Sequence, residues 1–311
     1  MKAKKSREEI LEYFKKHGNC DLPYCIEVAA DTEGEHVVVV GGTHGNEPAG
    51  VRAMVAFHRR LKDGEIKLNS GKVSLLMGNP QAYRKNRRYV DRDLNRSFGD
   101  PDDAALEGRR AGEIKNYLDR NTDIAALLDL HSVSIGDFKI CVYEKDNAPS
   151  LDLTLSISDI PLHFAYHPEH MPGALITAAG RRQICGLIVE CGNHLSKQGV
   201  DTALVHMQAI LGRYHLFNTA VRRPQRKTLT IEQYESIGAI KPGPNFNFLI
   251  TDVETGTKLA KGQLFGRDDS GDHRAPQDCY IVAPSRVVKS TDYDAGFLGR
   301  LKLLKIKKQK V

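Results

Sequence analysis

The stretch that decides the fold is HVVVVGGTHGNEPAG, residues 36 to 50. Its first half is apolar without alternation, which predicts a central strand covered on both faces. Ligands of open α/β sheets bind beyond the carboxyl ends of strands, and the loop here carries His44 and Glu47, three residues apart. Side chains at this spacing can converge, and the pair would supply two of the three protein ligands of a catalytic zinc site. The alternative is a glycine-rich turn with a chance histidine and glutamate, so a third ligand is needed.

His131 is the candidate for that third ligand. It ends the apolar segment AALLDLH, residues 125 to 131, and so also lies at the carboxyl end of an expected strand. Asp129 would face the same side of that strand and could orient the histidine, although a loop-capping role is an alternative. Glu190 ends a third apolar strand, CGLIVE, where it could take a proton from a metal-bound water. A structural glutamate is the alternative there.

Two polar segments contain further candidate residues. The segment YRKNRRYVDRDLNRSF, residues 83 to 98, is rich in arginine, and its apolar residues would anchor it to the body of the protein. Guanidinium groups bind carboxylates in a bidentate manner and stabilise oxyanions. In HFAYHPEH, the rival ligands His163, His167 and His170 are interpreted as loop or surface residues, because Pro168 would disturb a helical face.

Helical and strand-like segments alternate around these motifs. The segment YCIEVAA, residues 24 to 30, is expected to form a hairpin with the strand that begins at His36. Alternation predicts an α/β domain with a mostly parallel sheet over residues 1–220. A linker-like segment, VRRPQRK, precedes short β-prone pieces, which predict a smaller β-rich C-terminal domain over residues 221–311. Further strands are expected at 72–79, 125–130, 139–143 and 185–189, and helices at 6–16, 49–61, 104–118, 173–181 and 201–217.

Composition indicates an ordinary globular protein. The 311 residues include 41% hydrophobic residues and carry a net charge of +6, with many basic residues at the two ends. These ends are interpreted as solvated surface, since no nucleic-acid motif accompanies them. No apolar run reaches the roughly 18 residues of a membrane span, no secretory signal is visible, and the six cysteines form no CxxC pair. We therefore expect a cytoplasmic location, reduced and mostly buried thiols, and neither a nucleic-acid nor a membrane partner.

The motifs together resemble the aspartoacylase/succinylglutamate desuccinylase family, a branch of the zinc carboxypeptidase-like fold. The resemblance rests on GGTHGNE (41–47), NP (79–80), RYVDRDLNR (88–96), DLH (129–131) and VE (189–190), in family order. It implies a mixed, mostly parallel sheet flanked by helices. The implied residue roles are zinc ligands for His44, Glu47 and His131, water activation for Glu190, carbonyl polarisation for Arg88, and substrate carboxylate binding for Asn95 and Arg96.

The expected activity is zinc-dependent hydrolysis of the amide bond of a small acidic N-acyl amino acid, N-acetylaspartate-like or N-succinylglutamate-like. One zinc ion per chain is expected. A zinc carboxypeptidase acting on peptides, a binding module with a vestigial site, and a nucleic-acid binder are the alternatives. Arg181 or Arg182 is a further candidate for the site, and so is Tyr293, but the sequence does not establish whether these residues reach it. The sequence also leaves the oligomeric state open.

Overall fold

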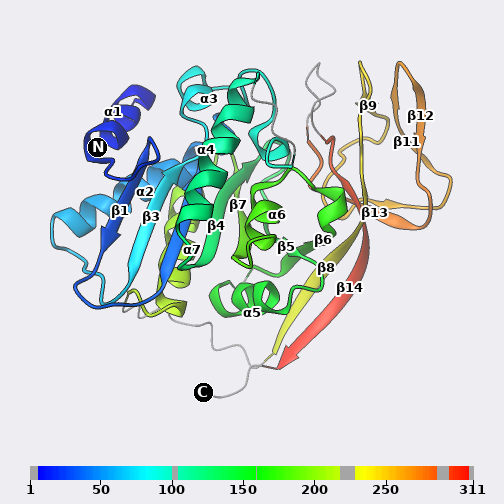
Figure 1. Cartoon of the computed structure of the whole chain (residues 1–311). Coiled ribbons are helices and arrows are strands. Elements are labelled where there is room, and N and C mark those ends of the chain that lie inside the picture. Colours follow the sequence, from blue (N-terminus) through cyan, green and yellow to red (C-terminus); the bar gives the residue numbers. More distant parts are fainter. Residues whose placement is uncertain (1–5, 100–103, 159, 218–227, 286–293, 308–311) are drawn as a thin grey trace.

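One large mixed sheet organises the chain (Figure 1). The computed structural model describes residues 6–99, 104–158, 160–217, 228–285 and 294–307. The sheet has eleven strands in the order β1-β3-β2-β4-β7-β5-β6-β8-β14-β13-β10. Its first seven strands in the chain are β1 (Cys25–Ala29), β2 (His36–Gly41), β3 (Lys72–Met77), β4 (Ile124–Val133), β5 (Lys139–Glu144), β6 (Leu162–Tyr166) and β7 (Cys185–Asn193).

Strand β2 occupies the central position that its apolar sequence predicts. All of its residues are buried, and it pairs in parallel with β3 on one side and β4 on the other. The predicted hairpin between β1 and β2 is wrong, because β1 pairs antiparallel with β3 at the edge of the sheet. Strands β3 and β4 occupy both hydrogen-bonding edges of β2, so none is left for β1, whose partly exposed end suits the edge of the sheet.

Helices cover both faces of the sheet, and each face has its own hydrophobic core. On one face lie α1 (Arg7–His17), α2 (Pro48–Lys62), α5 (Ala148–Ile157) and α7 (Gly199–Arg213). On the other face lie α4 (Leu106–Arg120) and α6 (Leu175–Gly180). The short helix α3 (Pro80–Lys85) and the 3-10 turns η1 (Leu94–Arg96) and η2 (Pro168–His170) complete the helical elements that the structure describes. The predicted α/β class with a mixed sheet is confirmed.

The C-terminal β region continues the same sheet. Strand β8 (Thr228–Ala239) pairs in parallel with β6, and β14 (Phe297–Lys307) pairs with β8 along its whole length. Strands β13 (Cys279–Val282) and β10 (Lys258–Leu259) complete the large sheet, while β9 (Asn247–Phe248), β11 (Leu264–Asp268) and β12 (Gly271–Arg274) form a small second sheet. The domain boundary expected at residue 220 falls within residues 218–227, outside the described part of the chain.

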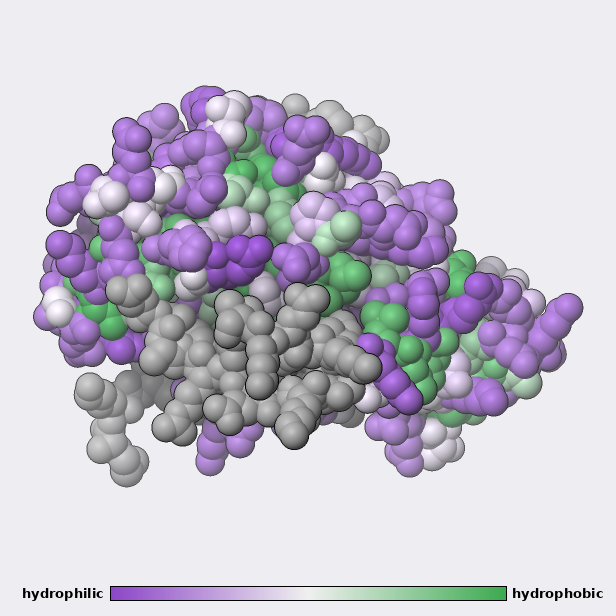
Figure 2. Space-filling view, turned by 90° about the horizontal axis from the view of Figure 1, so that it is seen from below, coloured by the Kyte–Doolittle hydropathy of each residue, from purple (hydrophilic) through white to green (hydrophobic). Residues whose placement is uncertain are grey.

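One face of the molecule is largely hydrophilic where its residues are described. Seen from below, hydrophilic side chains cover most of the face, and hydrophobic ones appear in separate areas (Figure 2). Within the described residues, no helix is both long and apolar enough to cross a membrane. All six cysteines are free, and only Cys20 is partly exposed, which agrees with the expectation of mostly buried thiols.

Candidate metal centre and active site

The loop between β2 and α2 holds its two candidate ligands through local backbone geometry. Gly42 has a φ of 70°, which favours glycine. A Cβ atom on Gly45 would lie 2.0 Å from the backbone carbon of Ala82, so only glycine fits against α3. Pro48 occupies the first turn of α2, and Glu47 is the N-cap residue, but the Glu47 side chain makes no capping hydrogen bond. Its carboxylate therefore turns toward the neighbouring histidines.

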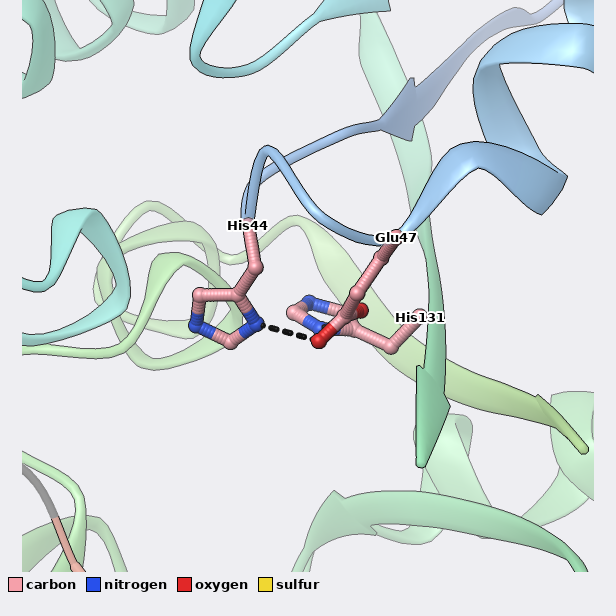
Figure 3. A group of neighbouring side chains, drawn as sticks. All are labelled: His44, Glu47 and His131. Carbon is pink, nitrogen blue, oxygen red and sulfur yellow. Dashed lines mark hydrogen bonds and ion pairs between the residues drawn. The ribbon is translucent and has the colours of Figure 1, made fainter. Parts of the chain in front are cut away.

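His44, Glu47 and His131 form one buried cluster (Figure 3). Glu47 Oε1 lies 2.8 Å from His44 Nδ1, and Glu47 Oε2 lies 3.1 Å from His131 Nδ1. The possible ligand atoms all lie within 4.8 Å of one another. His44 and Glu47 extend from the loop after β2, and His131 comes from β4, as the sequence predicts for two neighbouring parallel strands.

Both histidine rings contact a second carboxylate through the other ring nitrogen. His44 Nε2 lies 3.1 Å from Asp93 Oδ1, and His131 Nε2 lies 2.8 Å from Asp129 Oδ2. The Thr43 hydroxyl donates to the other oxygen of Asp129 at 2.8 Å. Carboxylates in these positions orient metal-bound imidazoles and fix their tautomers. The sequence pointed to Asp129 for this position, whereas Asp93 was missed.

This arrangement fits a cation. A neutral imidazole has one N–H and can donate to only one of two carboxylates. If each Nε2 donates to its aspartate, the Nδ1 lone pairs of His44 and His131 both face the Glu47 carboxylate. A bound metal ion would then accept electron pairs from both histidines and from Glu47. Although burial opposes it, Asp129 and Glu47 raise the pKa of His131 well above its usual range. The surrounding carboxylates thus favour positive charge at this point, and the cluster could hold a metal ion.

Glu190 lies beside the cluster, and one of its carboxylate oxygens has no hydrogen-bond partner among the described residues. It is the register partner of His131 in the parallel pair of β4 and β7. Its Oε2 atom is buried and accepts no hydrogen bond from the described residues. Burial raises the pKa of Glu190 to about 7. A carboxyl group in this state can both accept and donate a proton near neutral pH.

Arg88 approaches the cluster from the arginine-rich loop. Its Nε donates to Asp93 Oδ2 at 2.9 Å, and its Nη1 lies 3.9 Å from Glu47 Oε1. Although burial opposes it, Asp93 and Glu47 raise the pKa of Arg88, so this side chain stays cationic. Asp93 also caps η1 by accepting from the Asn95 N–H at 2.8 Å. One aspartate therefore fixes His44, Arg88 and the start of η1.

The two candidate substrate-binding residues already have protein partners. Asn95 Oδ1 accepts from the Leu175 N–H at 2.9 Å, at the start of α6. Arg96 donates through Nε to Asp294 Oδ2 at 2.9 Å, and Nη2 lies 2.7 Å from the same oxygen. Asp294 belongs to the C-terminal β region, and nothing in its local sequence indicated this contact.

Glu107 holds the backbone of the arginine-rich loop through hydrogen bonds. This fully buried residue of α4 accepts hydrogen bonds from the backbone N–H groups of Val90, Asp91 and Arg92 at 2.6, 3.0 and 3.2 Å. Asn79 Nδ2 donates to the same carboxylate at 3.0 Å. The sequence gave no signal for this role, because a glutamate in the first turn of a helix is an ordinary surface feature.

All seven predicted site residues line a single cavity of about 240 Å³. The lining also includes the apolar side chains of Val142, Phe164, Ile188 and Phe297. Residues 283–285, Asp294, Gly296 and Phe297 of the C-terminal region also line the cavity. Arg182 instead pairs with Asp119, and Arg181 is exposed, so neither belongs to this lining. Tyr293 lies outside the described residues.

The rival histidines lie apart from the cluster. His167 directly precedes η2 and His170 is its last residue, and His170 Nδ1 lies 2.5 Å from Ser236 Oγ. The interpretation of His163 as a loop or surface residue is wrong, because it lies within β6 and is 1% exposed. Its Nε2 lies 3.1 Å from the Ile160 carbonyl oxygen, which satisfies one ring nitrogen of a buried, neutral side chain. The sequence emphasised Pro168 and so missed the strand before it.

Known proteins share these features. Residues 33–212 match the family model described as the succinylglutamate desuccinylase/aspartoacylase catalytic domain. An N-acyl-aromatic-L-amino acid amidohydrolase (carboxylate-forming) from Xenopus laevis is 38% identical over 106 residues, which cover 32% of this chain and 34% of that protein. A probable aspartoacylase from Parasynechococcus marenigrum is 32% identical over 185 residues, covering 55% of this chain and 57% of the relative. The chain thus matches only about a third to a little over half of these relatives' lengths.

The fold is shared over nearly the whole chain. The crystal structure of succinylglutamate desuccinylase from Vibrio cholerae superposes with a TM-score of 0.72 at 20% identity. The superposition covers 91% of this chain and 89% of that one. It includes the C-terminal β region, which the family model does not reach.

Proposed function

Because the chain belongs to the succinylglutamate desuccinylase/aspartoacylase family, we propose that it hydrolyses the amide bond of a small N-acyl amino acid with the help of zinc. The observation that carries this proposal is the convergence of two Nδ1 atoms on the Glu47 carboxylate. His44, Glu47 and His131 would hold the ion. Zinc in such a site acts as a Lewis acid and lowers the pKa of a bound water toward about 7.

Glu190 is the proposed general base and acid. Its unpaired Oε2 is buried beside His131 and lines the cavity, where a substrate amide would bind. The carboxylate takes a proton from the attacking water and returns it to the departing amine nitrogen. The cleavage releases a carboxylate and a free amino acid. A pKa raised by burial suits both transfers.

Arg88 is proposed to stabilise the oxyanion of the tetrahedral intermediate. Asp93 holds its Nε, which fixes the plane of the guanidinium beside the metal ligands. A preorganised cation stabilises the charge that develops on the carbonyl oxygen and needs no reorganisation during the reaction. Asp93 thereby supports two parts of the site at once, Arg88 and the metal ligand His44.

The substrate carboxylate is proposed to bind at Asn95 and Arg96, which line the cavity. An acidic N-acyl amino acid, N-acetylaspartate-like or N-succinylglutamate-like, is one candidate and agrees with the names of several relatives. An N-acyl amino acid with an uncharged side chain is a second candidate. It is favoured by the apolar wall of Val142, Phe164 and Ile188, and the Xenopus laevis relative is named for aromatic substrates.

A small substrate is favoured over a peptide. The C-terminal segments that line the cavity narrow it, and about 240 Å³ suits an acylated amino acid better than an extended chain. The cytoplasmic location and the single zinc ion expected from the sequence belong to the same proposal.

The test is a substrate panel with zinc-loaded protein: N-acetylaspartate, N-succinylglutamate, N-acetylasparagine, N-acetylphenylalanine and a short peptide. We expect cleavage of at least one N-acyl amino acid and little cleavage of the peptide. Cleavage of the peptide alone would move the protein to the carboxypeptidase alternative. Absence of any turnover in the presence of bound zinc would refute the proposed activity.

A further inference from the structure

We propose that Asp294 is a specificity-determining residue, which keeps one edge of Arg96 from the substrate and disfavours a second carboxylate in the cavity. The inference rests on the proposed function and deepens it. Asp294 lines the same cavity as Arg96 and Glu190, yet it comes from the C-terminal region, far along the chain from either. Its side chain is 2% exposed, so its charge acts in a poorly solvated environment.

The contacts of Arg96 limit how many carboxylates it can bind. A guanidinium presents two edges that can each hold a carboxylate through two N–H groups. The edge formed by Nε and Nη2 is taken by Asp294 Oδ2, at 2.9 and 2.7 Å. Nη1 donates to the Asn95 carbonyl oxygen at 2.8 Å. Only the edge formed by Nη1 and Nη2 can then face a substrate, and it has room for one carboxylate.

In the part of the chain that the structure describes, the other cations near the cavity do not offer a second carboxylate site. Arg88 is held by Asp93 and is directed toward the metal cluster. Among the described residues that line the cavity, Arg88 and Arg96 are the only arginines, and no lysine lines it. Lys241 Nζ lies 2.8 Å from Asp294 Oδ1, but Lys241 does not line the cavity and is largely exposed. Lys241 partly neutralises the charge of Asp294 from outside, although Oδ1 makes no hydrogen bond with the described residues.

The rest of the lining completes the selection. The same lining includes the apolar side chains of Phe164, Met171 and Phe297, none of which can solvate a charge. A second substrate carboxylate placed against these side chains near Arg96 would meet apolar groups and the like charge of Asp294. An uncharged side chain of the same size meets neither penalty. Specificity of this kind arises from a repulsive element as much as from an attractive one.

The experiment compares two substrates of nearly equal shape, N-acetylaspartate and N-acetylasparagine, which differ by one charge. For wild-type protein and Asp294→Asn, the ratio of kcat/KM for the acidic substrate over the neutral one is measured. We expect Asp294→Asn to raise this ratio on the order of tenfold, equivalent to about 1.4 kcal/mol. Lys241→Gln should lower the ratio, because it strengthens the unneutralised charge of Asp294. Asp272→Asn, which alters an ion pair with Arg267 outside the cavity, should leave it unchanged.

A binding measurement separates specificity from a purely structural effect. Calorimetric affinities of zinc-loaded Glu190→Gln protein for the two substrates, with and without Asp294→Asn, should change in the same direction as the kinetic ratio. Asp294→Glu should restore preference for the neutral substrate. If wild-type protein cleaves N-acyl amino acids but Asp294→Asn and Lys241→Gln both leave the ratio unchanged, the inference about Asp294 is wrong while the proposed function stands. If no N-acyl amino acid is bound or cleaved, the proposed function itself fails, and the inference fails with it.

Discussion

Replacing Glu107 with alanine should loosen the arginine-rich loop and lower both stability and activity. Three backbone N–H groups and Asn79 Nδ2 donate to this buried carboxylate. A hydrogen bond to a charged group contributes about 1.5 to 3 kcal/mol, and the partly buried donors could regain water after the substitution. We therefore expect a loss smaller than the sum of four such bonds, about 3 to 5 kcal/mol, which is still a large part of the stability of a typical domain.

Urea unfolding and hydrolysis rates measured on the same samples would test this. Activity per folded molecule should fall as well, because the loop carries Arg88 and Asp93. Asp119→Ala on the same helix is the matched control, since its exposed pair with Arg182 should contribute at most about 1 kcal/mol. If Glu107→Ala were no more destabilising than Asp119→Ala, Glu107 would not be what holds the loop.

Three further predictions follow from named contacts. Asp129→Asn should weaken zinc binding about 10- to 100-fold in a chelator competition, because an amide cannot accept hydrogen bonds from both His131 and Thr43 as the carboxylate does. An unchanged zinc affinity would argue against an orienting role for Asp129. Glu190→Gln should retain zinc but lose on the order of 100-fold or more in kcat, and near-normal turnover would remove it as general base. Burial lowers the pKa of His163 to about 4, so the folded protein binds fewer protons than the unfolded one and stability falls as the pH drops from about 6.5 toward 4. His163→Gln should remove up to about 3 kcal/mol of this loss in urea unfolding, and an unaltered pH slope would show that His163 stays uncharged for another reason.

The sequence predicted best where local pattern and chemistry coincide. The unbroken apolar run of β2 required burial on both faces, and the structure places it at the centre of the sheet. Because parallel strands end at one edge of a sheet, the residues at the ends of β2, β4 and β7 could be expected to meet. The motifs supplied the order of these residues, and geometry brings all seven to one cavity.

The sequence pattern did not predict which strands pair with one another when they are far apart in the chain. The local sequence of β1 does not show whether it pairs with β2, the next strand in the chain, or with β3. The predicted hairpin of β1 and β2 was wrong for that reason. Likewise, the β-prone segments after residue 220 revealed their strands but not that β8 and β14 extend the large sheet. Asp294 and Glu107 act through contacts with residues far away in the chain, which only the fold makes visible.

The most direct test of the account is metal content measured together with hydrolysis of an N-acyl amino acid. We predict about one zinc ion per chain, loss of activity on removal of the metal by a chelator, and recovery when zinc is restored. His131→Ala should lose both the metal and the activity. Undiminished hydrolysis by metal-free protein, or full activity of His131→Ala, would contradict the assignment of His44, Glu47 and His131 as a catalytic zinc site.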